Sequence, residues 1–153
     1  MRNAAIMLIR LIVGLFFLAA GLSKIGSPLQ TLAAIYSYQI VLPDWLANTI
    51  AYSLPWLEVL LGLGLLIGLW LPVFTAATAG LLVVFAILTA QAWWRELPID
   101  CGCIDLSAIH PALAVLSTPG SATLRNLVLL VLCVALLWLM RGKSAKRELQ
   151  AAA

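Results

Sequence analysis

The sequence predicts an all-α membrane protein, a single bundle of four transmembrane helices with a short interfacial helix in the first outer loop. Of its 153 residues, 64% are hydrophobic and only 10% are charged. A water-soluble domain of this length has too little interior to bury so much apolar surface, so lipid is the solvent for most of the chain. Four stretches approach the roughly 20 apolar residues that a span requires. They lie near residues 4–22, 54–71, 72–94 and 124–140 of one domain, 1–153.

The first predicted helix carries charged and small residues along one face. These residues recur at steps of three or four and are Arg10, Gly14, Phe17, Gly21 and Lys24. That spacing places side chains on one side of a helix. Small residues there permit close approach of a second helix, and a charge on the same face should point at protein rather than lipid. With ~1.5 Å of rise per residue, Lys24 should lie about 21 Å from Arg10, near the outer end.

The segment after the first span predicts a short helix at the membrane interface. Residues 29–38 combine apolar positions with Tyr36 and Tyr38, as interfacial helices and aromatic belts do. The second span is then expected to open at Leu54-Pro55, because proline is tolerated in a first helical turn. Glu58 would follow in the first turns, where the helix dipole favours an acid.

Glu58 is expected to pair with Lys24. A carboxylate within a span is costly unless it is paired or protonated, and Lys24 should lie at a similar depth. Further along the second span, Gly64 and Gly68 predict a small-residue packing face. A tight turn at Pro72 should connect the second and third spans.

The fourth span should begin near Ser121, whose hydroxyl is suited to an N-cap. Arg125 and Asn126 then lie in its first turns, close to the outer surface. Asn126 shares a face with Cys133, which is expected to be a small buried apolar residue.

Basic residues set the expected orientation. Arg2 precedes the first span, and four more follow the last one: Arg141, Lys143, Lys146 and Arg147. Because basic short segments stay in the cytoplasm, both termini should be cytoplasmic and the two longer loops periplasmic, in a bacterial inner membrane. The net charge of +3 reflects this asymmetry, so no nucleic-acid partner is indicated. An alternative is a cleaved signal peptide, because Ala19-Ala20-Gly21 resembles a cleavage site.

Cys101-Gly102-Cys103 lies in the last outer loop and is the candidate catalytic site. The periplasm is oxidising, and a disulfide that encloses one residue departs from relaxed geometry, which makes it easy to reduce. Such a small ring also does little to constrain the unfolded chain, which favours a redox role over a structural one. Two alternatives stay open: a soft-metal site for copper(I) or zinc that adds His110 to the thiols, and a structural or inert pair.

The chain resembles the MauE/DoxX family of redox-associated membrane proteins. The matching pieces are the Arg10 to Lys24 stripe, Leu54-Pro55-Trp56-Leu57-Glu58, Cys101-Gly102-Cys103 and Arg125-Asn126, in this order over nearly the whole chain. The resemblance implies a four-helix bundle active in thiol–disulfide or electron exchange at the periplasmic face. MauE-type proteins are linked to maturation of a disulfide-rich methylamine dehydrogenase subunit beside a thioredoxin-like partner, and relatives include a subunit of a thiosulfate:quinone oxidoreductase. In one departure, Ile104-Asp105 replaces the family's usual Phe-Gly.

The preferred hypothesis is therefore a thiol–disulfide oxidoreductase component, with a quinone as its candidate cofactor. Cys101 and Cys103 would carry the chemistry, and a polar cluster of Lys24, Glu58, Arg125 and Asn126 would support them. The expected partners are a periplasmic thioredoxin-like or other redox protein, further membrane subunits and the lipid bilayer. The alternative is a membrane anchor or assembly subunit that performs no chemistry, because the short chain has no recognisable nucleotide or haem motif.

Overall fold

The computed structural model describes residues 2–39, 41–96 and 119–151, and every regular element among them is a helix. The helices are α1 (Arg2–Ile25), α2 (Pro28–Ser37), α3 (Asp44–Ile67), α4 (Leu71–Trp94) and α5 (Pro119–Ala151). All except α2 are long and apolar enough to cross a membrane, which confirms the predicted fold class. Cys101, Cys103 and His110 lie outside the described residues.

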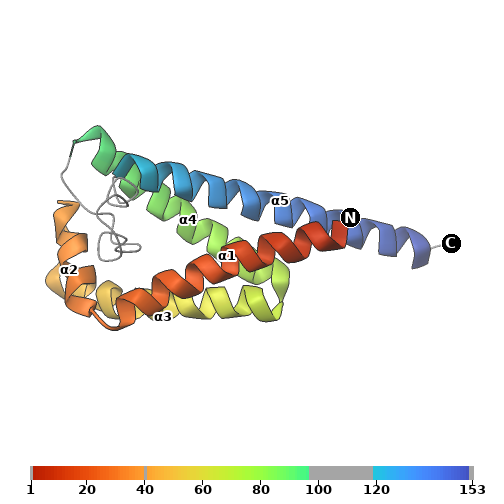
Figure 1. Cartoon of the computed structure of the whole chain (residues 1–153), viewed down its shortest axis with the longest axis horizontal. Helices are drawn as coiled ribbons and strands as arrows, with labels where there is room; N and C mark the ends of the chain where they lie inside the picture. Colours follow the sequence, from red (N-terminus) through yellow and green to blue (C-terminus); the bar gives the residue numbers. More distant parts are fainter. Residues whose placement is uncertain (1, 40, 97–118, 152–153) are drawn as a thin grey trace.

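The four long helices form two antiparallel pairs, α1 with α3 and α4 with α5 (Figure 1). Both chain termini lie at one end of the molecule, called here the termini end. The short helix α2 lies across the opposite end, called the α2 end (Figure 1). Because α4 runs toward the α2 end and α5 runs away from it, the segment between them begins and finishes there.

The predicted stripe on α1 is the surface that packs against α3. A methyl group added to Gly21 would come within 2.7 Å of the Pro55 carbonyl oxygen, and one added to Gly14 within 2.9 Å of the Leu66 side chain. Phe17, between them, is buried. The two backbones therefore approach as closely as glycine permits, as small residues on a helix face predict.

At the termini end, Arg10 binds the last turn of α3. Its Nε donates to the Leu65 carbonyl oxygen at 3.0 Å, and its Nη2 donates to the Leu66 carbonyl oxygen at 3.0 Å. The last four carbonyls of a helix have no partner within that helix, so the guanidinium satisfies two of them. Gly68 ends α3 in the left-handed conformation, with φ of 83°, and packs directly against the guanidinium.

The prediction that the second span opens at Leu54 is wrong. Helix α3 begins at Asp44, so Pro55 lies inside it and Glu58 is far from its first turn. The polar residues that made 44–53 resemble a loop hydrogen-bond to their own helix instead. Each of three side chains donates to the carbonyl four residues earlier: Asn48 to Asp44, Thr49 to Trp45 and Ser53 to Thr49. Such bonds satisfy these side chains within their own helix, so their polarity does not interrupt it, and membrane helices tolerate an internal proline.

Two smaller predictions, for Gly68 and for Ser121, also differ from the structure. Gly68 is the C-cap of α3 rather than a packing position within a helix, whereas Gly64 does pack against the Phe74 ring of α4. Helix α5 begins at Pro119, which suits a first turn because proline has no N–H to leave unsatisfied. Ser121 therefore lies inside α5 and is not its N-cap.

A single hydrophobic core joins the two helix pairs. Its buried residues are Val13, Phe17, Leu61, Leu65, Leu82, Leu129 and Cys133. Asn126 and Cys133 are both buried, which confirms that they share a face of α5 turned toward the interior. On α4, three buried threonines donate their hydroxyls to carbonyls of the preceding turn, namely Thr75, Thr78 and Thr89. The buried face of α4 therefore carries polar residues, but their hydroxyl groups are hydrogen-bonded within α4 itself.

Candidate functional site

A buried ion pair joins α1 to α3 near the α2 end. Lys24 lies in the last turn of α1, and its Nζ donates to both carboxylate oxygens of Glu58, at 2.7 and 2.9 Å. Only 1% of Glu58 and 9% of Lys24 are exposed. The pairing predicted from sequence is therefore confirmed.

A contribution to the stability of the folded protein does not explain why this ion pair is buried. Removing two charges from water is expensive, and apolar residues of similar volume often do as well or better in the same place. Ionisable residues inside membrane spans are rare and usually belong to a binding site or a proton pathway. The Lys24–Glu58 pair therefore marks this end of the bundle as the candidate functional site.

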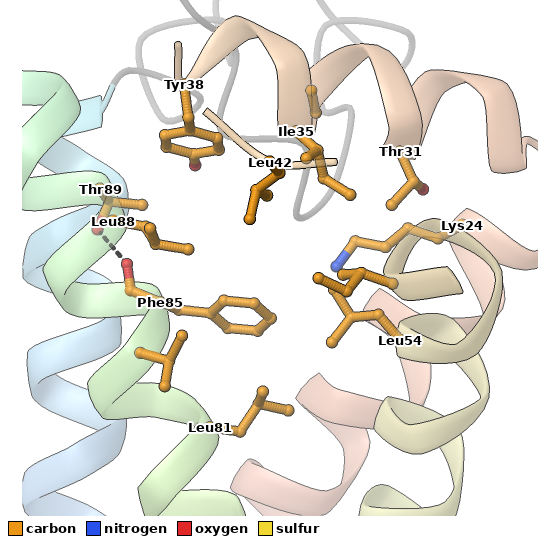
Figure 2. Close-up of a pocket in the computed structure, with 13 residues that line it drawn as sticks. Lys24, Thr31, Ile35, Tyr38, Leu42, Leu54, Leu81, Phe85, Leu88 and Thr89 are labelled. Atoms are coloured by element: carbon orange, nitrogen blue, oxygen red, sulfur yellow. Dashed lines mark hydrogen bonds between the residues drawn. The ribbon is translucent and has the colours of Figure 1, made fainter. Parts of the chain in front are cut away.

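The pair stands beside a cavity of about 370 Å³. Figure 2 shows the cavity between the two helix pairs and beneath α2, with the Lys24 ammonium pointing into it. The apolar lining residues are Ala34, Ile35, Leu42, Ile50, Leu54, Leu81, Val84, Phe85 and Leu88. The Nζ of Lys24 also lies 5.6 Å from the centroid of the Phe85 ring, within the range of a cation–π contact.

Few polar groups line the cavity. They are Lys24, Thr31, Tyr38 and Thr89. The Thr89 hydroxyl donates to the Phe85 carbonyl oxygen at 2.8 Å (Figure 2). The buried Thr31 hydroxyl has no hydrogen-bond partner within the described part of the chain. The described wall of the cavity is thus mostly apolar, with one cationic donor in Lys24 and, in Thr31, a buried hydroxyl without a partner among the described residues.

The other members of the predicted polar cluster lie on α5. The guanidinium carbon of Arg125 stands 5.3 Å from the centroid of the Phe16 ring of α1, again a cation–π distance. Asn126 is 1% exposed, and its amide nitrogen has no hydrogen-bond partner among the residues that the structure describes. Among the described site residues, the direct ionic contact predicted within the cluster is the one between Lys24 and Glu58.

Sequence reasoning missed the cavity and its aromatic wall. Tyr38 was expected only to anchor the chain at the interface, and Phe85 was not singled out. The lining residues come from α1, α2, α3, α4 and the connection between α2 and α3, and they share no motif, so no local pattern joins them. They meet only because α2 folds across the space between the helix pairs.

Comparison with known proteins identifies the family. A model of the methylamine utilisation protein MauE matches residues 2–139. The chain belongs to the MauE family. It is 33% identical over 129 residues to the methylamine utilization protein MauE of Paracoccus denitrificans, an alignment that covers 84% of this chain and 66% of that relative. The chain thus spans slightly less than two thirds of the relative's length. No solved structure matches the chain.

Family membership and the four apolar helices together make this a multi-pass membrane protein. The resemblance to MauE proteins inferred from the sequence is confirmed. The family assignment does not depend on the Cys-Gly-Cys segment alone, because the match runs from α1 into α5.

Proposed function

We propose that this protein exchanges thiol–disulfide or electron equivalents at the periplasmic face of a bacterial inner membrane, in support of the maturation or electron transfer of a periplasmic redox partner. The proposal extends to a role in a methylamine utilisation-like system, as the name of the Paracoccus relative suggests. The observation that carries it is the buried Lys24–Glu58 pair beside a cavity at the α2 end. A thioredoxin-like protein is the proposed partner.

The orientation follows from charge and from the position of the termini. Both termini lie at one end of the bundle (Figure 1), and the sequence around them is basic. Basic segments next to spans favour the cytoplasm, which supports a periplasmic location for the α2 end. The connection from α4 to α5 begins and finishes at that end and carries Cys101 and Cys103 in its sequence.

The two thiols follow α4 closely in the sequence. Cys101 is only five residues beyond Glu96, the last described residue after α4. Oxidation of the two thiols to a disulfide passes two electrons and two protons to an acceptor: the disulfide of a thioredoxin-like partner, which becomes a dithiol, or a quinone, which becomes a quinol. The protons need an acceptor or a path, and a buried carboxylate–ammonium pair is suited to that task.

Redox trapping of the cysteines tests the proposal. Free thiols are fixed in acid and then alkylated with a mass tag, with and without a reduced thioredoxin-like protein. We expect Cys101 and Cys103 to shift together between dithiol and disulfide, and Cys101→Ser with Cys103→Ser to abolish the exchange. Cys133→Ala is the matched control, because Cys133 is fully buried in the core and should take no part. If the pair stays in one state across periplasmic potentials, and the chain with both cysteines replaced by serine still supports its host, the anchor role replaces the redox role.

Labelling of intact cells tests the orientation separately. A membrane-impermeant maleimide should modify Cys101 or Cys103 of the reduced protein without permeabilisation, whereas buried Cys133 should stay unmodified. Modification only after the membrane is opened would reverse the assigned orientation and remove the periplasmic role.

A further inference from the structure

We propose that the cavity beneath α2 binds the ring of a lipid-soluble quinone, with the Lys24 ammonium donating a hydrogen bond to one ring carbonyl. The redox purpose of such a ligand rests on the function proposed above. Binding itself rests on the cavity alone, whose described wall includes neither Cys101 nor Cys103.

The size and lining of the cavity suit one apolar ring system. Small-molecule sites usually occupy about 300–1,000 Å³ and combine apolar walls with a few polar groups that fix orientation. This cavity, at about 370 Å³, lies at the lower end of that range. Phe85 and Tyr38 face the space together with aliphatic side chains from α3 and α4 (Figure 2). A flat ring can pack against these apolar side chains.

Lys24 supplies the donor that an acceptor on the ligand would use. An ammonium group has three N–H donors. Two are directed to the Glu58 oxygens, and the nitrogen itself faces the cavity (Figure 2). The buried Thr31 hydroxyl belongs to the same wall. A carbonyl oxygen on the ligand would therefore meet a cationic donor on a wall that is otherwise mostly apolar.

Charge balance favours a neutral ligand over a fatty-acid carboxylate. Glu58 already neutralises Lys24, so an added anion would stand next to an ion pair of zero net charge in a medium of low dielectric constant. Burying a charge without its own counterion is costly. A neutral carbonyl can accept from the ammonium without that cost. A phospholipid tail fills apolar space equally well but offers no acceptor to Lys24.

Titration of the full-length protein in detergent micelles with decylubiquinone, read by native mass spectrometry, tests the site. Ala34 lines the cavity from α2, and the adjacent Ala33 is exposed and does not line it. Because tryptophan at position 34 would fill the space, Ala34→Trp should weaken binding at least about tenfold. Ala33→Trp should bind as the unmodified chain does. Saturable 1:1 binding that Ala34→Trp removes and Ala33→Trp keeps is the expected result.

The donor is tested in a chain that keeps the site neutral. Lys24→Met combined with Glu58→Gln removes the ammonium without stranding a carboxylate, and should weaken decylubiquinone binding by about tenfold, the loss expected for one hydrogen bond to a charged donor. Equal affinity of this variant and the unmodified chain would overturn the assigned role of Lys24. Palmitate should fail to displace decylubiquinone, and displacement at equal concentration would overturn the preference for a neutral ligand.

Two further outcomes separate this proposal from the preceding one. Absence of saturable decylubiquinone binding, or binding that Ala34→Trp leaves intact, would overturn the cavity assignment whatever the cysteines do. Decylubiquinone binding should persist in the Cys101→Ser, Cys103→Ser chain, because the described cavity wall does not include these residues. Inert thiols together with intact binding would reject the thiol exchange while leaving the quinone site in place.

Discussion

Two cations on the same face of α1, Arg10 and Lys24, have hydrogen-bond partners of different kinds. Arg10 donates to two backbone carbonyls in the last turn of α3. Lys24 also bonds to α3, but it donates to a side chain, the carboxylate of Glu58. Every helix ends with unpaired carbonyls, so the partners of Arg10 exist whatever the sequence of α3 is. The partner of Lys24 is an acid that itself had to be buried within a span.

The difference separates a structural charge from a functional one. Arg10 completes a helix end that would otherwise expose polar backbone to lipid, and the fold fully accounts for it. The Lys24–Glu58 pair satisfies no backbone group, and two apolar residues could take its place. Its position beside the cavity is what gives it a use.

The largest effect is expected from breaking the ion pair. Lys24→Met leaves Glu58 buried without a counterion and should destabilise the protein by about 3 to 5 kcal/mol, measured by reversible unfolding in mixed micelles. Adding Glu58→Gln should recover part of that loss, since the stranded charge is then removed. Strictly additive effects of the two substitutions would show that the residues are not coupled.

Gly68→Ala should have the next largest effect, because it disturbs the Arg10 end. Gly68 has φ of 83° and packs directly against the guanidinium, so an added Cβ meets both backbone strain and a contact. We expect a loss of about 2 kcal/mol in the free energy of unfolding. Gly80→Ala is the control, because a Cβ there meets nothing within 4 Å and helix propensity should make it neutral or slightly stabilising. Equal effects at the two glycines would contradict the capping role of Arg10.

Arg10→Lys should reduce the free energy of unfolding by less than Gly68→Ala does. A lysine retains the charge but is not a planar fork, so it cannot reproduce both bonds to Leu65 and Leu66 in the same geometry. The expected cost is about 1 kcal/mol, the usual net value of one hydrogen bond. Binding of decylubiquinone should not change, because Arg10 does not line the cavity. If Arg10→Lys abolished decylubiquinone binding without changing stability, Arg10 would have a functional role, and the contrast between a structural Arg10 and a functional Lys24 would be wrong.

The smallest effect concerns an exposed bond between α2 and α3. The Tyr36 hydroxyl donates to the Asp44 carboxylate at 2.9 Å, and this bond raises the pKa of Tyr36 above its ordinary 10.0. Since the neutral phenol is favoured in the folded state, the stabilisation is complete below pH 10 and is lost as the pH rises through the raised pKa. Tyr36→Phe should remove this pH dependence from melting curves between pH 9 and about 11. An unchanged alkaline slope would show that the bond does not persist in solution.

The sequence predicted the features that depend on charge within apolar stretches. Few ionisable residues occur there, so the pairing of Lys24 with Glu58 followed from their similar depth. The stripe on α1 was predicted for a similar reason, because helical spacing fixes which residues share a face. The stripe needs only the helix period. The pairing is confirmed, although the start of the second span from which the depth of Glu58 was inferred is wrong.

The start of α3 and the cavity could not be predicted in this way. Pro55 suggested a helix start, but whether a proline begins a helix or lies inside one depends on what its neighbours bond to. The polar residues before it are satisfied within α3, which only the structure shows. The cavity depends on where α2 crosses the bundle, and the residues that line it are spread from Lys24 to Thr89.

The short turn between α3 and α4 has a consequence for biogenesis. Only residues 68–70 separate the two helices, so both spans should enter the bilayer together as a hairpin. Lys24 precedes Glu58 by 34 residues and is therefore synthesised first. When the hairpin carries Glu58 into the membrane, its counterion is already present at the end of α1. The order of synthesis thus provides the counterion before the carboxylate that needs it is buried in the membrane.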